Sequence, residues 1–412
     1  MKDSPVQKII IDKPYSFVPP HQGDWWPTCI RKLNIFERWL KKNEGIVSYQ
    51  CRHVDRLRQS IEEGYGVLIT PNHCRSGDPV VMGWLAKKAN CLLYAMASWH
   101  LFNQTRFMSW AIPKMGGFSV NREGLDRKAL TMAIDSLAAA KRPLVIFPEG
   151  AVTRTNDRLS ALLDGVSFIA RAAAKKRERE DPPGKVVVHP VALRYLFHGD
   201  LEAAADKVLT AIEERFSWQP QGRLPLLERV GKVGEILLAS KEVEYFGETQ
   251  QGELSARLQG LIDRILGPLE KEWLGEIGDG EVVPRIKKLR LQIVPDLIRG
   301  VLDEQERQRR WGQLADIYLS QQVASYPPDY LSEGCSRERL LETIERFEED
   351  LTDKVTVHGD LEVIIEVGER IEVQPQSHRS DDVDPLMVEI KQALAGMLAD
   401  LAEKEIEPWP GS

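Results

Sequence analysis

Residues 67–78 read Val67-Leu68-Ile69-Thr70-Pro71-Asn72-His73-Cys74-Arg75-Ser76-Gly77-Asp78. The apolar run at 67–70 predicts a buried strand, and the Pro-Asn pair predicts the loop that ends it. Ligands of α/β sheets bind beyond the carboxyl ends of strands, so a site is expected at this loop. An imidazole beside a carboxylate that fixes its tautomer is the arrangement that a general base needs, and His73 and Asp78 are therefore candidate catalytic residues.

The same stretch has a simpler interpretation. Asp78-Pro79, followed by apolar residues, is typical of a helix start over 79–88 in which Asp78 is the N-cap and Pro79 the first helical residue. His73 is then an ordinary loop histidine. The spacing of the two residues leaves both interpretations open, and three further segments favour the catalytic one.

These segments follow in order along the chain. They read Gly116-Gly-Phe-Ser-Val-Asn-Arg122, Phe147-Pro-Glu-Gly150 and Val186-Val-Val-His-Pro-Val-Ala-Leu193. Together with the Asn-His-x-x-x-x-Asp pattern at 72–78, they resemble the four ordered motifs of the glycerolipid acyltransferases, the family of lysophosphatidic acid acyltransferase. Each motif is weak by itself, and the four in order are specific.

The resemblance implies roles for individual residues. His73 would take the proton of the acceptor hydroxyl, and Asp78 would orient His73 and stabilise the imidazolium. Arg122 closes the second motif and is the first candidate to bind a phosphate, which suits a fork-shaped guanidinium. Glu149 and Gly150 match the third motif, where the glutamate would bind the acceptor or organise the arginines. A structural pairing of Glu149 with an arginine is the alternative. No acyl-enzyme is implied.

The third motif departs from the common family continuation Glu-Gly-Thr-Arg-Ser. Here the chain reads Glu149-Gly150-Ala-Val-Thr-Arg154-Thr, so the arginine comes two residues later. This version resembles that of the glycerol-3-phosphate acyltransferases. Arg154 is expected to reach the phosphate, and Arg75 and Arg158 are its possible substitutes. The identity of the acceptor therefore stays open.

Strand-like and helix-like segments alternate between about 50 and 200, which predicts an α/β fold with a mostly parallel sheet covered by helices. The expected strands are 67–70, 91–97, 117–121, 144–147 and 186–193, and the expected helices are 79–88, 99–110, 126–141 and 162–175.

The chain is expected to have four parts. Residues 1–45 form an N-terminal extension with an amphipathic helix, and 46–200 form the acyltransferase core. Residues 201–353 are helical and acidic without an evident internal repeat, and are interpreted as a large insertion. Residues 354–412 bring the closing strands, at 354–357 and 361–373, and a helix at 385–404. Val367-Gly-Glu-Arg-Ile371 resembles the turn that closes the family's domain, so strand 361–367 should pair into the same sheet.

Composition limits the class of protein. The chain has 412 residues, 42% hydrophobic and 28% charged, as in soluble globular proteins. No stretch approaches the roughly 18 apolar residues of a transmembrane helix, and the N-terminus lacks the apolar core of a signal peptide. Five cysteines without metal-ligand spacing predict reduced thiols in a cytoplasmic protein, with Cys74 as a small packing residue. Neither a metal nor a cofactor is expected.

Charge is unevenly distributed. Residues 1–200 carry 30 Lys and Arg against 19 Asp and Glu, whereas 201–412 carry 25 against 43. A basic half is attracted to anionic lipids or phosphorylated substrates. Nucleic acid is disfavoured because the basic residues are dispersed and no nucleic-acid motif occurs. Residues 24–42 predict an amphipathic helix with Trp, Lys and Arg, a combination used at membrane surfaces; packing on its own domain is the alternative.

The expected activity is transfer of a fatty acyl group from acyl-CoA or acyl carrier protein to the hydroxyl of a lysophosphatidic-acid-like acceptor in phospholipid biosynthesis. The alternative acceptor is glycerol-3-phosphate or another lipid alcohol or amine. A third interpretation, a non-catalytic lipid-binding adaptor, is disfavoured by the paired His73 and Asp78. The expected location is cytoplasmic and peripheral to a membrane. Acyl chain length, donor and oligomeric state stay open.

Overall fold

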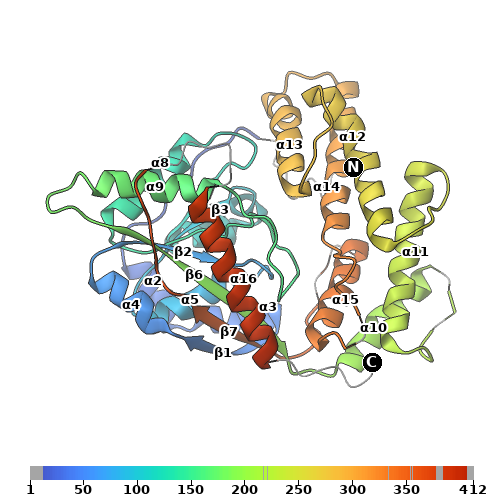
Figure 1. Cartoon of the computed structure of the whole chain (residues 1–412), viewed down its shortest axis with the longest axis horizontal. Helices are drawn as coiled ribbons and strands as arrows, with labels where there is room; N and C mark the ends of the chain where they lie inside the picture. The colour runs from blue at the N-terminus through green and yellow to red at the C-terminus, as the bar shows by residue number, and fades with distance from the viewer. Residues whose placement is uncertain are drawn as a thin grey trace. The chain divides into compact units, whose positions relative to one another are not determined.

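The structure, a computed structural model, describes residues 13–376 and 384–405, apart from positions 217, 220, 333, 353 and 355. It divides into two compact units (Figure 1). The sheet unit comprises Tyr15–Gly199 and Thr356–Ile406, and the helical unit is built from Asp200–Val355. The N-terminal part of the expected extension, 1–12, and the segments 377–383 and 406–412 lie outside the described residues.

One sheet organises the sheet unit. Within the described residues, its strands follow the order β1-β7-β6-β2-β5-β3-β4, with β8 paired to β6. All pairs are parallel except those of β6 with β7 and β8. The expected α/β fold with a mostly parallel sheet is therefore confirmed. The strands are β1 (Ile46–Arg52), β2 (Gly66–Pro71), β3 (Tyr94–Ser98), β4 (Gly117–Val120), β5 (Leu144–Val145), β6 (Val186–Phe197), β7 (Leu361–Val367) and β8 (Ile371–Glu372).

Helices cover both faces of this sheet. Val188 of β6 packs in a core with α8 (Arg127–Ala139), α9 (Gly165–Arg177) and α16 (Pro385–Glu405). The next residue, His189, hydrogen bonds Ser60 of α4 (Val54–Glu62). Because successive strand residues point to opposite faces, the two contacts place helices on each side. Figure 1 shows α16 crossing the sheet. Helix α5 (Asp78–Ala89) follows strand β2 along the chain.

The prediction of a single amphipathic helix over 24–42 is wrong. The segment forms α2 (Trp25–Lys32) and α3 (Ile35–Glu44), separated where Asn34 adopts the left-handed conformation with φ of 49°. Part of its apolar face packs inward, since Leu40 is fully buried. The helix expected near 99–110 is likewise divided, into α6 (Leu101–Gln104) and α7 (Arg106–Lys114), because Thr105 is extended and its hydroxyl accepts a hydrogen bond from the backbone of α7.

The closing segment is confirmed in part. Strand β7 lies between β1 and β6 in the same sheet as β2 and β5, as expected for 361–367. The run 361–373 is divided by the turn before β8. The expected strand at 354–357 is not formed by its described residues, and position 355 lies outside them. Strand β1, in contrast, was not expected from its sequence.

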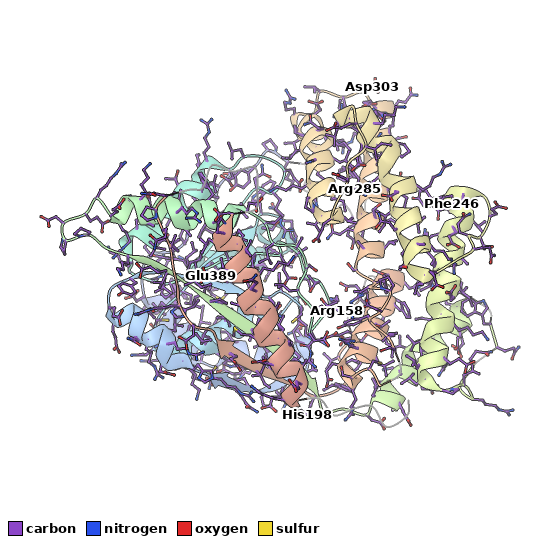
Figure 2. All side chains as sticks on the ribbon, in the orientation of Figure 1. Arg158, His198, Phe246, Arg285, Asp303 and Glu389 are labelled. Atoms are coloured by element: carbon purple, nitrogen blue, oxygen red, sulfur yellow. The ribbon has the colours of Figure 1, made fainter. Side chains whose placement is uncertain are left out.

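The chain leaves the sheet at the end of β6 and returns to it at the start of β7, and these two ends are paired. Phe197 at the end of β6 is the antiparallel partner of Leu361 at the start of β7. His198, labelled in Figure 2, donates its backbone N–H to the carbonyl of Asp360 over 2.9 Å. Next to this pair, a Cβ built on Gly359 lies 3.0 Å from the Cα of Gly199. The unit is thus inserted into the connection of a β-hairpin.

The helical unit contains an internal repeat that was not evident in the sequence analysis. Glu242-Val-Glu-Tyr-Phe-Gly-Glu-Thr-Gln-Gln-Gly-Glu253 and Glu270-Lys-Glu-Trp-Leu-Gly-Glu-Ile-Gly-Asp-Gly-Glu281 align without a gap. The corresponding residues Gly247 and Gly275 have φ of 85° and 84° and end their helices. The helices are α10 (Leu201–Arg215), α11 (Leu226–Phe246), α12 (Leu254–Leu274), α13 (Val282–Arg299), α14 (Glu304–Ala324) and α15 (Arg337–Thr352).

Each repeat is held by the same buried clamp. Arg257 donates Nε and Nη2 to the two carboxylate oxygens of Glu242 over 2.8 and 2.9 Å, and Nη1 to Glu235. One of these oxygens also accepts the backbone N–H of Gln250. The same contacts recur around Arg229 and, 28 residues after Arg257, around Arg285 (Figure 2). A fork-shaped pair with a backbone donor satisfies a buried carboxylate and fixes successive helices.

The hairpin geometry predicts that the sheet unit folds without the insertion. A chain with Gly199 joined directly to Gly359 should be soluble and cooperatively folded, because a four-residue connection with two glycines closes an antiparallel pair. Solubility, size-exclusion chromatography and thermal unfolding by circular dichroism measure this.

A chain that ends at residue 200 is the contrasting variant. It lacks β7, so β1 loses its partner and β6 presents a bare edge. Unpaired strand edges promote association, and this chain should aggregate. A folded, monodisperse chain ending at residue 200 would show that the sheet does not depend on its closing strand.

Candidate active site

The candidate site lies where strand β2 ends. The first residue after the strand, Asn72, uses its side-chain amide to pair with Leu193 of β6, donating to its carbonyl over 3.0 Å and accepting from its N–H over 2.7 Å. The side chain thereby continues the β2 ladder by one step and fixes the start of the loop. His73 follows directly, at the sheet edge where the sequence predicted a site.

His73 and Asp78 form a hydrogen-bonded pair. Nδ1 of His73 lies 2.9 Å from Oδ2 of Asp78. The aspartate side chain is fully buried, whereas the histidine ring keeps 14% of its surface exposed. The ring packs on Phe147, with centroids 4.3 Å apart. With Nδ1–H directed to the carboxylate, Nε2 is the nitrogen that can accept a proton. The sequence prediction that these two side chains come within hydrogen-bonding distance is confirmed.

Asp78 is held by two further donors. The backbone N–H of Arg75 donates to Oδ2 over 2.9 Å, and the hydroxyl of Tyr195 donates to Oδ1 over 2.5 Å. Tyr195 comes from β6 and is buried. Asp78 therefore does not act as a helix cap for α5 through its side chain. Its two oxygens are fully engaged in fixing the loop and the imidazole.

The backbone of His73 is joined to the third motif. Its N–H donates to Oε1 of Glu149 over 2.7 Å, and its carbonyl accepts the N–H and the hydroxyl of Thr153 over 2.8 and 3.1 Å. The second oxygen of Glu149 accepts the N–H of Ser160 over 2.8 Å. Glu149 thus joins its own segment, 147–150, to the loop that carries His73 and to the segment after Gly150.

The environment of Glu149 follows from this arrangement. Burial raises the pKa of its carboxyl group, while the two backbone donors and His73 oppose the rise. Both oxygens are occupied by backbone amides, so the contacts of Glu149 are those of a structural residue. The sequence-based expectation that Glu149 binds the acceptor or an arginine stays a prediction.

The side chain of Arg122 contacts the backbone of Gly150, the residue that follows this glutamate. The guanidinium of Arg122, which is half-buried, donates from Nη2 to the carbonyl of Gly150. Gly150 has φ of 71°, and a Cβ there would lie 2.5 Å from the side chain of Leu163. Glycine adopts this backbone conformation without strain and leaves Leu163 in place. The second and third motifs therefore come together at the loop that carries Glu149.

Two buried arginines adjoin the dyad. Arg75 has 4% and Arg154 has 7% of its surface exposed, and the guanidinium of Arg75 lies over the ring of Tyr195 at 5.4 Å. Both positive charges act on Glu44 at the end of α3, whose pKa is raised by burial and lowered by Ser76 and these arginines. Arg154 has φ of 56°, an uncommon conformation for arginine that often marks a functional position.

Some residues of the site were missed by the sequence analysis. Glu44 lies within the segment interpreted as a membrane helix, and no motif surrounds it. Tyr195 belongs to a strand but lies beyond the fourth motif, 117 residues from Asp78. The side-chain amide of Asn156 hydrogen bonds both the carbonyl and the N–H of Tyr195, as the amide of Asn72 does with Leu193. Cys74 is buried beside Leu193, in agreement with a packing role.

Comparison with known families agrees with this geometry. Residues 52–194 match the family model described as Acyltransferase, and the four motifs at 72–78, 116–122, 147–150 and 186–193 fall within this range. No curated protein matches the chain. Among the described residues, no helix is both long enough and apolar enough to cross a membrane. Residues 52–194 therefore match the acyltransferase domain of the glycerolipid acyltransferase family, which supports a general acyltransferase role in lipid metabolism.

Proposed function

We propose that the protein transfers a fatty acyl group from a thioester, acyl-CoA or acyl carrier protein, to the hydroxyl of a lysophosphatidic-acid-like acceptor. The observation that supports this most strongly is the pairing of a partly exposed His73 with a buried Asp78 at a strand end. The neighbouring arginines supply positive charge suited to a phosphate. The thioester donor is a co-substrate, and the proposal requires no further cofactor.

The chemical step needs one base. Nε2 of His73 takes the proton of the acceptor hydroxyl as its oxygen attacks the thioester carbonyl carbon. The C–O bond forms, the C–S bond breaks, and the proton passes from His73 to the departing thiolate. Asp78 holds the ring and stabilises the imidazolium formed on the way. A direct transfer of this kind requires no covalent acyl-enzyme.

The acceptor phosphate would be bound by Arg122 and Arg154, with Arg75 beside them. Bidentate contacts between guanidinium and phosphate are strong and directional. Glycerol-3-phosphate is the second candidate acceptor, because Arg154 follows Glu149 at the longer spacing seen in that branch of the family. Labelled acyl-CoA and acyl carrier protein, each tested with lysophosphatidic acid, glycerol-3-phosphate and unphosphorylated glycerolipids, distinguish these acceptors.

Replacing the base should abolish transfer. We expect His73→Ala to lower kcat by a factor of roughly 10² to 10⁴, the usual contribution of a general base, and to leave the fold intact. Asp78→Asn should also lower the rate and reduce stability, because a buried acceptor is lost. His198→Ala, a half-exposed histidine at the end of β6, is the matched control. Wild-type activity in His73→Ala would falsify the mechanism.

The phosphate assignment rests on Arg122. We expect Arg122→Gln to raise KM for the phosphorylated acceptor about tenfold, the effect of losing one charged hydrogen bond, and to change KM for the donor much less. Arg127→Gln, an exposed arginine at the start of α8, serves as control. An equal effect on both substrates, or no effect, would remove Arg122 from the acceptor site.

We further propose that the protein works at a membrane surface through an aromatic patch, defined as Trp25, Trp26, Phe107 and Trp110. Trp26 contacts Trp25 and Trp110 edge-to-face, with centroids 4.4 and 5.1 Å apart, and Phe107 adjoins Trp110. Trp25, Phe107 and Trp110 are exposed, at 66%, 60% and 43%. The patch joins α2 to α7, so the surface is wider than the predicted helix.

Charge beside the patch supports this assignment. Lys114 lies over the ring of Trp26 at 5.8 Å, and Arg31 and Lys32 end α2. Tryptophan with lysine and arginine is the usual combination at the boundary between lipid headgroups and acyl chains. Attraction to anionic lipid adds roughly 1 kcal/mol per basic residue near the surface.

Vesicle binding tests the patch. Binding should rise with the fraction of anionic lipid and fall with salt, and the double variant Trp25→Ser/Phe107→Ser should lose most of it. Phe168→Ser, an exposed aromatic residue of α9, is the control. Point variants are preferred to deleting residues 1–42, because Leu40 belongs to the buried core. Equal binding by the double variant and the control would exclude the patch as the membrane contact.

A further inference from the structure

Tyr195 has a place in the site that packing does not explain. Its side chain is buried, and its hydroxyl donates to Oδ1 of Asp78 over 2.5 Å. Burial and the charge of Asp78 raise the pKa of Tyr195 well above its usual value, so the hydroxyl remains a donor across the pH range of the enzyme. An O–H to carboxylate contact of this length belongs to the strong, charge-assisted hydrogen bonds.

The two oxygens of Asp78 are divided between two partners. Oδ2 faces Nδ1 of His73 and the backbone N–H of Arg75, and Oδ1 faces Tyr195. A carboxylate held on one oxygen alone can rotate about its bond to the Cβ atom. A donor on the other oxygen fixes the plane of the group, and therefore the direction in which the imidazole is held.

The backbone of Tyr195 is itself fixed. The side chain of Asn156 donates to its carbonyl over 2.6 Å and accepts its N–H over 2.7 Å. Asn72 makes the same pair of contacts with Leu193. Strand β6 therefore holds the loop before Asp78 and the loop after Gly150 in one register, with the hydroxyl of Tyr195 between them.

We propose that Tyr195 is a positioning residue of the acyl-transfer site, whose hydroxyl orients Asp78 and thereby sets the proton-accepting state of His73. The inference rests on the proposed function. Among the described residues, the titratable and charged groups around this cluster include Glu44 at the end of α3, Cys74 and Arg75 before α5, and Glu149 and Arg154 after β5.

The test compares Tyr195→Phe with Tyr326→Phe in the full chain. Tyr326, in the helical unit, is half-buried and donates to an aspartate, Asp350, over 2.6 Å. Both variants lose one hydroxyl from a Tyr–Asp pair. We expect Tyr195→Phe to lower kcat by roughly ten- to hundredfold, as when the outer partner of a functional histidine is removed. Tyr326→Phe should keep wild-type kcat.

The pH profile separates positioning from packing. Without the hydroxyl, more of the negative charge of Asp78 stabilises protonated His73, so the acid limb of kcat/KM should move to higher pH in Tyr195→Phe. In the Asp78→Asn background the same substitution should have little further effect, because its action passes through the carboxylate. An unchanged acid limb, or an effect that persists in full in Asp78→Asn, would overturn the proposal.

A second replacement keeps the test valid if Tyr195→Phe does not fold. Site-specific 3-fluorotyrosine at position 195 retains the ring and the hydroxyl and makes the hydroxyl a stronger donor. The acid limb should then move to lower pH, opposite to Tyr195→Phe, and no shift would contradict the proposal. If His73→Ala loses activity and the position-195 variants keep the wild-type pH profile, only the role of Tyr195 is rejected. Wild-type activity in His73→Ala rejects the proposed function.

Discussion

The structure depends on strand β6 being hydrogen bonded along both edges. On one edge it pairs with β2, and the side chains of Asn72 and Asn156 extend that pairing beyond the end of the shorter strand. On the other edge it pairs with β7 and β8. A buried strand cannot leave its backbone amides unpaired. The loops that carry Asn72 and Asn156, and the distant segment of β7 and β8, must therefore all hydrogen bond to β6. The loop that carries His73 is fixed to the sheet because Asn72 takes part in this pairing.

The need for β7 explains how a helical unit can be placed inside a catalytic domain. The sheet requires only that Phe197 and Leu361 face each other, and they do so across a closed hairpin connection. Whatever lies between those residues is free in length, provided that its ends meet. The helical unit has its own core and clamps such as Arg257–Glu242.

Sequence signals that act over short distances identified much of the fold and site. The apolar runs of β2 and β6 are buried on both faces and could be recognised without a partner. The pairing of His73 with Asp78 spans a single loop. Strand β1 was not predicted because it is an edge strand in which buried and exposed residues do not alternate regularly. The helical repeat was not recognised because charged residues 28 positions apart carry it, and it has no counterpart in the apolar periodicity.

Contacts that join distant segments could not be read from the sequence. Tyr195 gives no sign in its own neighbourhood that its hydroxyl reaches Asp78. Glu149 was recognised as important, but its partners proved to be the backbone amides of His73 and Ser160, which have no sequence signature. The break between α2 and α3 depends on one left-handed residue, Asn34, within a continuous amphipathic pattern.

The departure from the family pattern after Gly150 has a physical explanation. The threonine that directly precedes the arginine in the common pattern is still present here as Thr153, behind two additional residues. Thr153 donates both its N–H and its hydroxyl to the carbonyl of His73. The position of Arg154 is therefore set by its distance from the histidine, through Thr153, and not by its count from Glu149. A longer loop can keep the arginine next to the residue that bonds His73, because the loop is fixed at the end that carries the charge.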